Sequence, residues 1–325
     1  MATAENALLQ YEAGQNAVAM SALTNSGDAT TFTSAATLWS GKSGYAPVVR
    51  PNGLLTGGAV TPDGAAANDK VDVAALTCNL AGVVTSVTAG ELTITRGVSG
   101  DTHMINSITV KSDGTLEAIA GTDSTAFSET RAAAGGPPLI PVGSIEIAQV
   151  RTTSVTAAPI TAAEIFQVVG LHQERADFPL WDVLSGSGSV RFLAALPLIH
   201  TGTVPKKVYA SYASPIFADV ALASDFVPPE TSHSVSSTQV YGTTLGSTSS
   251  TLGQGSFKAY LSNGIADPLV VLKNATLWFK FFPDRYATPY LLAQGKLGIS
   301  RTFPAGDTIQ AACTISASAT ATEVS

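Results

Sequence analysis

The clearest alternation of hydrophobic and polar positions lies between Ala275 and Ala321. In its first run, Leu277, Phe279 and Phe281 alternate with Trp278, Lys280 and Phe282. This period of two predicts a strand that is apolar on one face and mixed aromatic on the other. The run ends at Pro283-Asp284, because proline cannot donate to a sheet ladder and Asp favours a turn.

Two further runs follow this strand. Lys296 to Phe303 places Leu297, Ile299 and Phe303 on one side, and Pro304 to Asp307 reads as the next turn. The last run alternates apolar or small residues with a Ser/Thr face. Its two sides are Ile309, Ala311, Cys313, Ile315, Ala317, Ala319 and Ala321 against Thr308, Gln310, Thr314, Ser316, Ser318, Thr320 and Thr322. The pattern predicts an antiparallel meander of three long strands, and none of its residues has the pattern of a catalyst.

The N-terminal part is less regular. Residues 5–11 are expected to form a short helix that ends before Gly14, and residues 26–37 a loop or an edge strand. Gly- and Pro-rich segments at 44–53 and 56–64 mark a first boundary between structural parts.

Short strands are predicted again between Val71 and Ala158. Apolar residues alternate with polar ones near Leu92 and Ile108, and Ser112-Asp113-Gly114 is typical of a tight hairpin. Five or so strands in this stretch favour a sandwich or a barrel-like unit. Thr161 and Glu164 have the spacing of a capping box, so either a short helix or a turn into a strand over 165–171 is expected there.

The region before the meander mixes apolar and polar runs. Val190 to Ile199 and Val208 to Tyr212 are predicted strands. Ser234 to Gln254 is rich in Ser, Thr and Gly and has no apolar period, so we interpret it as an arm or lateral loop that orders against a neighbour. Asp267-Pro268 favours a short helix over 269–273, whereas Val270 and Val271 favour a strand.

Composition points toward assembly. Only 13% of the 325 residues are charged, against roughly 25% in typical soluble proteins. Because the cores of protein interfaces are depleted in charge, this composition favours a chain that buries its surface against copies of itself. A secreted, Ser/Thr-rich β-protein is the alternative. A net charge of −7 argues against a basic surface that grips nucleic acid.

Cysteine usage and targeting signals add little. Cys78 and Cys313 are far apart in the sequence and do not make a disulfide framework, although a bond between them stays open. The first residues, Met1 to Asn6, lack the basic region of a secretory signal, and no apolar run of roughly 20 residues could span a membrane. We therefore expect a soluble protein that is made in a reducing cytoplasm.

Motifs for chemistry are weak throughout. The four histidines are not spaced as metal ligands, and Ser185 to Ser189 lacks the arrangement of a nucleophile turn. A phosphate-binding loop and a dinucleotide glycine motif are both missing, and the sequon at Asn274 has no secretory context. No catalytic, cofactor-binding or metal-ligating residue is predicted, so the chain is expected not to be an enzyme. The histidines are His103, His172, His200 and His233.

Two clusters of charged residues each have both a structural and a functional interpretation. Glu174, Asp177 and Asp182 could be paired carboxylates, but the adjacent Arg175 favours an ordinary salt-bridged segment. The turn at Asp284-Arg285 could be a solvated turn or a rim contact to a neighbouring subunit.

Several segments together resemble the tail tube, or major tail, proteins of long-tailed bacteriophages. The C-terminal segments are Leu277 to Asp284, Leu291 to Ile299 and Phe303 to Asp307, and the N-terminal ones are Phe32 to Ser34 and Arg50 to Gly58.

The resemblance implies a mainly β fold, an antiparallel β-sandwich or barrel-forming tube domain with a short flanking helix and an additional β domain. Residues 1–64 would be the N-terminal part of the tube domain, 65–160 an inserted or second β domain, and 161–325 the main tube domain. No cofactor is implied. The expected partners are copies of the chain in a ring, either a hexamer or a trimer with pseudo-sixfold symmetry, together with other tail proteins at the tube ends.

The function implied is structural. Stacked rings would form the hollow conduit for the genome in the virion tail, assembled in the host bacterial cytoplasm, with DNA passing through without specific binding. Two alternatives remain: a capsid decoration or fibre-associated virion protein, and a carbohydrate-binding β-protein.

Overall fold

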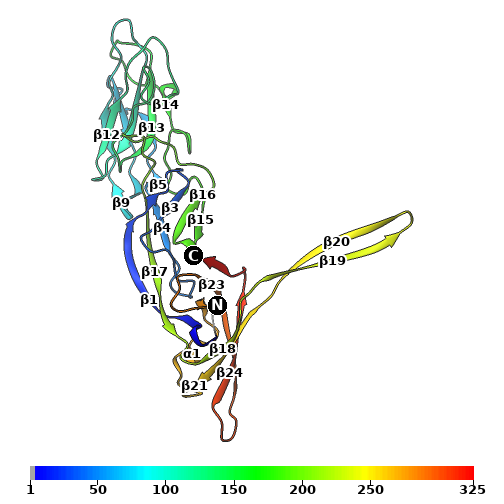
Figure 1. Ribbon diagram of the computed structural model, residues 1–325. Coiled ribbons are helices and arrows are strands. Elements are labelled where there is room, and N and C mark those ends of the chain that lie inside the picture. The colour runs from blue at the N-terminus through cyan, green and yellow to red at the C-terminus, as the bar shows by residue number, and fades with distance from the viewer. Residues whose placement is uncertain (1–3) are drawn as a thin grey trace. The chain divides into compact units, whose positions relative to one another are not determined.

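A computed structural model describes residues 4–325 (Figure 1). The described residues form 25 strands, one α-helix and three 3-10 helices, and the named strands pair antiparallel. The chain is therefore mainly β, as predicted. It divides into two compact units. The first unit comprises the residues up to Ala17 with Leu38–Ala46 and Tyr212–Ser325, and the second comprises Val18–Thr37 and Pro47–Ser211.

The first unit is built on one antiparallel sheet with the strand order β18-β21-β24-β23-β22-β1-β17, and β25 pairs with β23. A separate two-stranded hairpin, β19 and β20, belongs to the same unit. The elements are η1 (Ala4–Asn6), β1 (Leu8–Ala22), β17 (Val208–Asp219), β18 (Ala223–Val227), β19 (Thr231–Val240), β20 (Thr243–Leu252), β21 (Gly255–Leu261), α1 (Pro268–Val271), β22 (Thr276–Phe282), β23 (Tyr290–Thr302), β24 (Ile309–Ala317) and β25 (Thr322–Val324). Strands β1 and β17 begin in one unit and end in the other.

The predicted C-terminal meander is confirmed. β22 pairs with β23, and β23 pairs with β24, with Leu297 directly opposite Ile315. The apolar side chains of the three strands lie in one core together with Leu9 and Phe257. The Ser/Thr side of β24 is exposed. The last strand ends at Ala317 and not at Ala321, because the chain leaves β24 there and returns to β23 as β25.

The predicted helix over 5–11 is wrong. Only a single 3-10 turn forms, and β1 begins at Leu8. β1 lies between β22 and β17, so both of its edges have a partner strand. Pairing buries Leu9 and Tyr11 on one face, which an isolated helix of this length could not achieve. Long-range pairing thus overrides the local preference.

Two other predictions are settled in the first unit. α1 forms as a short helix, with the Asp267 carboxylate accepting the Leu269 N–H at 3.0 Å, so the strand alternative for 269–273 is wrong. The segment 234–254 is an arm, as one interpretation had it, but a regular hairpin and not a loop.

The second unit contains four small sheets, with strand orders β10-β7-β6, β12-β11-β13-β14, β15-β16-β3-β2 and β5-β8-β9. β4 pairs with the first part of β17. The elements are β2 (Thr24–Asn25), β3 (Thr31–Thr33), β4 (Val48–Pro51), β5 (Gly53–Gly57), β6 (Val60–Pro62), β7 (Lys70–Val73), β8 (Leu76–Leu80), β9 (Val83–Val87), β10 (Gly90–Thr93), β11 (Met104–Val110), β12 (Leu116–Ala120), β13 (Ile145–Thr152), η2 (Ala162–Glu164), β14 (Ile165–Phe166), β15 (Trp181–Leu184), η3 (Ser185–Ser187) and β16 (Ser189–Phe192).

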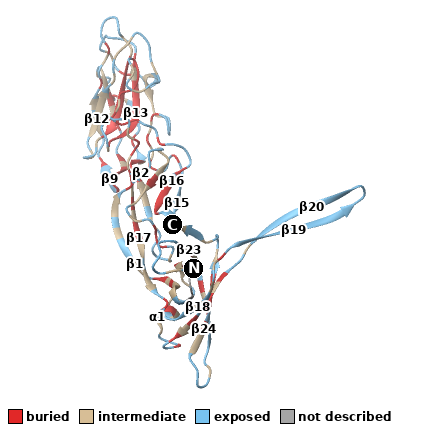
Figure 2. Cartoon of the chain, in the orientation of Figure 1, coloured by how far each residue is buried: buried red, intermediate tan, exposed pale blue. Residues whose placement is uncertain are grey.

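Three of these sheets share one hydrophobic core, to which β7, β8, β11 and β13 contribute alternating residues. Every residue of β11 is buried, and β13 is buried along most of its length (Figure 2). The hairpin at Ser112-Asp113-Gly114 is confirmed between β11 and β12. The capping box of Thr161 and Glu164 is also confirmed. The strands expected over 165–171 and 190–199 are shorter, ending at Phe166 and Phe192.

The boundaries of the two units lie elsewhere than at 64 and 160. Residues 65–160 all belong to the second unit, which also takes in much of the chain on both sides of them. The described part of the chain contains no helix long and apolar enough to cross a membrane.

Candidate functional site

The hairpin of β19 and β20, called the arm below, has almost no contact with its own unit. Ten residue pairs run from Thr231 opposite Leu252 to Val240 opposite Thr243. Nineteen of these twenty residues are exposed, so both faces of the ribbon meet solvent. The twentieth, Leu252, is half-buried. Figure 1 shows that the arm projects away from the sheet of the first unit. Figure 2 shows that it is exposed along its length.

The arm is held by local contacts alone. The hydroxyls of Ser234 and Ser249 are 2.7 Å apart across the strands, as are those of Ser236 and Ser247. A single two-stranded hairpin is at best marginally stable in water. Both of its outer edges also present unpaired N–H and C=O groups, which are a template for pairing with another chain. Charged residues and prolines usually protect such edges from pairing. Neither occurs between Thr231 and Leu252.

The sheet of the first unit has a second unusual surface. The exposed side of β21, β24 and β23 carries hydroxyls and small residues with very few charges. Lys258 on β21 is paired with Asp225 at 2.9 Å, and Lys296 on β23 is exposed. β18 forms the end of this sheet, and its last residue Val227 and the preceding Leu222 are exposed. This polar face also includes Ser256, Tyr260, Gly298, Ser300, Thr302, Gln310, Ala312, Thr314 and Ser316.

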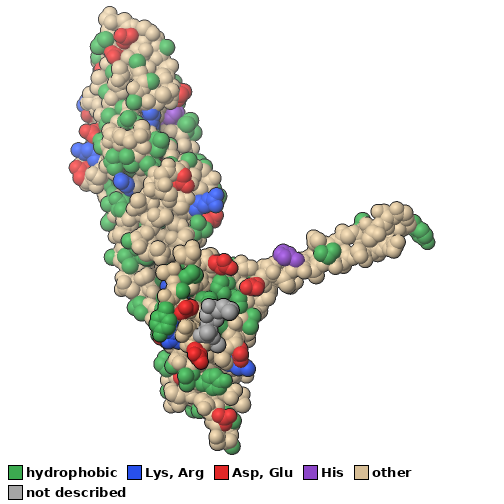
Figure 3. Space-filling model, in the orientation of Figure 1, with side chains coloured by type: hydrophobic (Ala, Val, Ile, Leu, Met, Phe, Trp, Pro, Cys, Tyr) green, Lys and Arg blue, Asp and Glu red, His purple; other side chains and the backbone are tan. Residues whose placement is uncertain are grey.

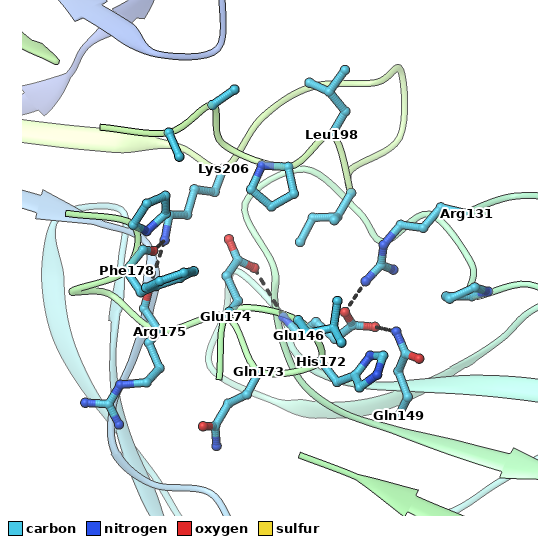
Figure 4. Close-up of a pocket in the computed structure, with 18 of the residues that line it drawn as sticks. Arg131, Glu146, Gln149, His172, Gln173, Glu174, Arg175, Phe178, Leu198 and Lys206 are labelled. Carbon is cyan, nitrogen blue, oxygen red and sulfur yellow. Dashed lines mark hydrogen bonds and ion pairs between the residues drawn. The ribbon is translucent and has the colours of Figure 1, made fainter. Parts of the chain in front are cut away.

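The second unit contains a pocket of about 430 Å³ (Figure 4). Charged side chains are buried in its floor. Glu146 forms an ion pair with Arg131 and also accepts hydrogen bonds from Ser107 and Gln149. Glu174 lies beside it and accepts the backbone N–H of Glu146 at 3.3 Å. Lys206, only 1% exposed, donates to the backbone carbonyls of Arg175 and Phe178.

Burial shifts the proton equilibria of these groups. Desolvation raises the pKa of Glu174 to about 7, although nearby Lys206 partly opposes the shift. Desolvation also raises the pKa of Glu146 and lowers that of Lys206. For His172, burial and the Arg151 charge lower the pKa, which favours the neutral ring.

Two polar atoms at this pocket have no partner among the described residues. They are Oε1 of Glu174 and Nδ1 of His172. Arg151 has only N–H donors and lies 3.5 Å from His172 Nε2, so that nitrogen accepts and the neutral ring carries its proton on Nδ1. The pocket thus offers one free acceptor and one free donor in a buried setting, where an unpaired polar group is costly.

The candidate residues from the sequence are separated by the fold. Glu174 is in the pocket, Asp177 pairs with Arg175 at 3.0 Å, and Asp182 is exposed on β15. Paired carboxylates are therefore not formed by these three residues. The segment Ser185 to Ser189 makes a single 3-10 turn between β15 and β16, without the strand-to-helix context of a nucleophile. Arg285 donates to the carbonyls of Asn6 and Ala7 of its own chain, so the turn at 284–285 is tied down internally.

The histidines are dispersed. His172 lines the pocket, His200 is buried and its Nε2 contacts the Ser144 carbonyl, and His233 is on the arm. His103 packs edge-on against Phe127. Among the described residues, no group of potential metal ligands includes a histidine.

One carboxylate cluster escaped the sequence patterns. Oxygens of Asp63, Asp72 and Glu91 lie within 4.8 Å of one another on the sheet β10-β7-β6. Internal groups already use them: Glu91 pairs with Lys70, Asp72 accepts the Gly64 N–H, and Asp63 accepts the Ala67 N–H. We assign no metal to this cluster, because these internal partners already use its carboxylates.

Neither the family models nor the curated proteins contain a match to this chain. The functional interpretation therefore depends on the arm, the polar sheet face and the pocket.

Proposed function

We propose that this chain is a tail tube subunit of a long-tailed bacteriophage, which assembles with copies of itself into stacked rings and does no catalysis. The arm carries this proposal. A ribbon of ten uncharged residue pairs, exposed on both faces, has an aggregation-prone edge unless it is covered by a specific partner. Identical copies, closing around a common axis, supply that partner without leaving edges free.

The open end of the sheet supports the same conclusion. Among the described residues, β18 has a partner strand on one side only, and its last residue Val227 and the preceding Leu222 are exposed. Joining this end to a strand of the next subunit would continue the sheet around the ring. Barrel closure of this kind removes sheet edges altogether. The resemblance of the meander segments to tail tube proteins agrees with this arrangement.

The polar face of β21, β24 and β23 suits the wall of a DNA conduit. Each Lys or Arg in contact with phosphate adds affinity through counterion release, which would retain DNA. This face carries hydroxyls, with two lysines of which one is paired to Asp225. We place it toward the bore, where DNA passes without specific binding.

Electron microscopy of the purified chain tests the proposal. We expect rings or hollow tubes in a concentration-dependent manner. A matched variant replaces residues 232–251 by Asn-Gly, which closes the hairpin between Thr231 and Leu252 with a favoured two-residue turn. Because the arm packs on so little of its own chain, this variant should unfold at the same temperature as the parent yet fail to form tubes. Parent protein that stays monomeric at every concentration would refute the proposal.

A further inference from the structure

The tip of the arm is apolar and carries a phenol. Val240 and Leu245 lie on the same face of the hairpin, and Tyr241 stands in the turn with its side chain fully exposed, at 108% of the reference area. Figure 3 shows hydrophobic side chains at this end of the arm and a few more along its length. An aromatic ring with a hydroxyl at its end is a typical interface anchor, apolar along its body and able to hydrogen-bond at its tip.

The pocket of the second unit has the complementary features. Glu174 is 7% exposed, and its Oε1 has no hydrogen-bond partner among the described residues. Lys206 makes no hydrogen bond to this oxygen, and its ammonium donates to the backbone carbonyls of Arg175 and Phe178. The large side chains of Leu171, Phe178 and Leu198 line the same pocket and are 63%, 45% and 49% exposed. A ligand that matches this pocket would have a hydrogen-bond donor for Glu174 Oε1 and an apolar body to pack against the three exposed apolar side chains.

The arm can enter such a pocket at low electrostatic cost. It has no Asp, Glu, Lys or Arg between Thr231 and Leu252, so no charge is desolvated on its side. Its ten residue pairs give it a reach of about 33 Å at roughly 3.3 Å per residue. This reach extends well beyond the subunit's own sheet.

We propose that Tyr241 of one copy enters the pocket of a second copy, with its ring between Phe178 and Leu198 and its hydroxyl donating to Glu174 Oε1. The contact rests on the proposed function, since it joins subunits of one tube. It is heterologous: arm and pocket are different surfaces of the same chain, so each copy both gives an arm and receives one. Such contacts propagate from copy to copy into rings or filaments.

Disulfide crosslinking between two differently marked copies tests the contact. One preparation carries Tyr241→Cys and the other Leu198→Cys, and the two are mixed, assembled and oxidised. The native thiols of Cys78 and Cys313 are buried and do not interfere. The matched control replaces Leu198→Cys by Val98→Cys, a residue of the second unit that is 60% exposed and does not line the pocket.

We expect a covalent dimer on a non-reducing gel in the Leu198 mixture and at least about tenfold less in the Val98 mixture. Tubes without this dimer would overturn the pocket contact and leave the proposed function standing. If the mixture forms no tubes although the parent does, photocrosslinking from position 241, described next, tests the contact instead. A parent without tubes overturns both proposals. A crosslink that forms only within a doubly substituted chain, and never in the mixture, would overturn the role of a second copy.

A photoreactive benzophenone side chain at position 241 keeps an aromatic ring and needs no cysteine. After irradiation of assembled tubes, we expect mass spectrometry to find it joined to a peptide that includes Phe178 or Leu198. Adducts found elsewhere would refute the contact.

The hydroxyl has its own test. Tyr241→Phe keeps the ring and removes the donor to the buried Glu174 carboxyl oxygen, so we expect the critical concentration for assembly to rise about tenfold. Tyr241→Ala removes the ring as well and should raise it by about a further tenfold. Equal assembly by all three proteins would overturn the proposal. If parent tubes instead bind a simple sugar such as glucose in this pocket, seen as density there after soaking, a small polyol and not the arm is the occupant.

Discussion

The carboxylate of Glu12 on β1 accepts a hydrogen bond from the backbone N–H of Trp278 on β22, with 3.1 Å between Glu12 Oε2 and the nitrogen. Strand pairing between β1 and β22 runs from Leu8 to Tyr11 and stops one position before Glu12. The Glu12 side chain thus supplies a hydrogen-bond acceptor at the position where the backbone hydrogen bonds between β1 and β22 end. The same carboxylate accepts from the Ser40 hydroxyl and from Gln15 Nε2, and Glu12 is fully buried.

Glu12→Ala should therefore destabilise the first unit by about 2–4 kcal/mol, because it leaves the Trp278 N–H and the Ser40 hydroxyl buried without an acceptor. Glu12→Gln keeps one acceptor oxygen and should lose less than half as much. Denaturant unfolding followed by tryptophan fluorescence measures both. Equal losses for Ala and Gln would show that the side chain's bulk, and not its acceptor, matters.

The second prediction concerns Glu174 and pH. Because the pKa of Glu174 is about 7 in the folded chain, against 4.5 as its ordinary value, the folded state holds this proton more tightly than the unfolded state. Stability from this group is therefore fully present below about pH 4.5 and is lost as the pH rises through 7. The loss reaches at most about 3 kcal/mol, at roughly 1.36 kcal/mol for each pKa unit.

Glu174→Gln should remove this loss of stability. The unfolding free energy of the variant minus that of the parent should therefore increase from pH 5 to pH 8. Denaturation curves at closely spaced pH values measure it. Leu180→Ala, at a side chain that is 63% exposed and carries no titratable group, is the control and should give a flat difference. A flat difference for Glu174→Gln as well would place the carboxylate in a solvated environment.

The two cysteines give a third prediction. Both are free and buried, and desolvation raises the pKa of Cys78 to about 11 and that of Cys313 to about 12. Since the thiolate is the reactive form, neither should react with a thiol reagent at pH 8 while the chain is folded. Two thiols per chain should react in denaturant. Rapid labelling of the native protein would contradict the burial of these side chains.

A fourth prediction tests the arm as an assembly element. Ser236 and Ser247 lie directly opposite each other, with their hydroxyls 2.7 Å apart. Ser236→Lys together with Ser247→Lys places like charges across the hairpin, which is destabilising, and should abolish tubes.

The matched control, Ser236→Lys with Ser247→Glu, keeps opposite charges across the strands and should retain more tube formation. Light scattering and microscopy compare the two at equal concentration. Full assembly by the double lysine variant would mean that the arm is not packed between subunits.

The fifth prediction concerns the polar face of β24. Thr314→Lys with Ser316→Lys adds two cations to its exposed side, and tubes of this variant should bind DNA more tightly. The salt dependence of binding should steepen by up to about 2 in the log–log slope. Thr314→Ser with Ser316→Thr adds no charge and should behave as the parent. If the lysine variant binds DNA no better, this face does not line the bore.

Local patterns in the sequence were sufficient for several elements. Regular alternation from Leu277 onward predicted β22, β23 and β24, because one face of each strand packs into a shared core and the other meets solvent. The hairpin after β11 and the capping box at Thr161 depend on residues a few positions apart, so short-range chemistry decides them. The Asp267-Pro268 pair indicated a helix start in the same way.

Tertiary structure alone decided the rest. Leu8 to Tyr11 became a strand because two distant strands flank it, and the arm became a hairpin through a register of ten pairs that its weak pattern does not encode. The pocket brings Arg131, Glu174 and Lys206 together from three separate loops. Burial, and with it the raised pKa of Glu174, follows from that packing. Sequence by itself determines what each residue prefers locally, whereas pairing and desolvation depend on partners that only the folded chain brings into contact.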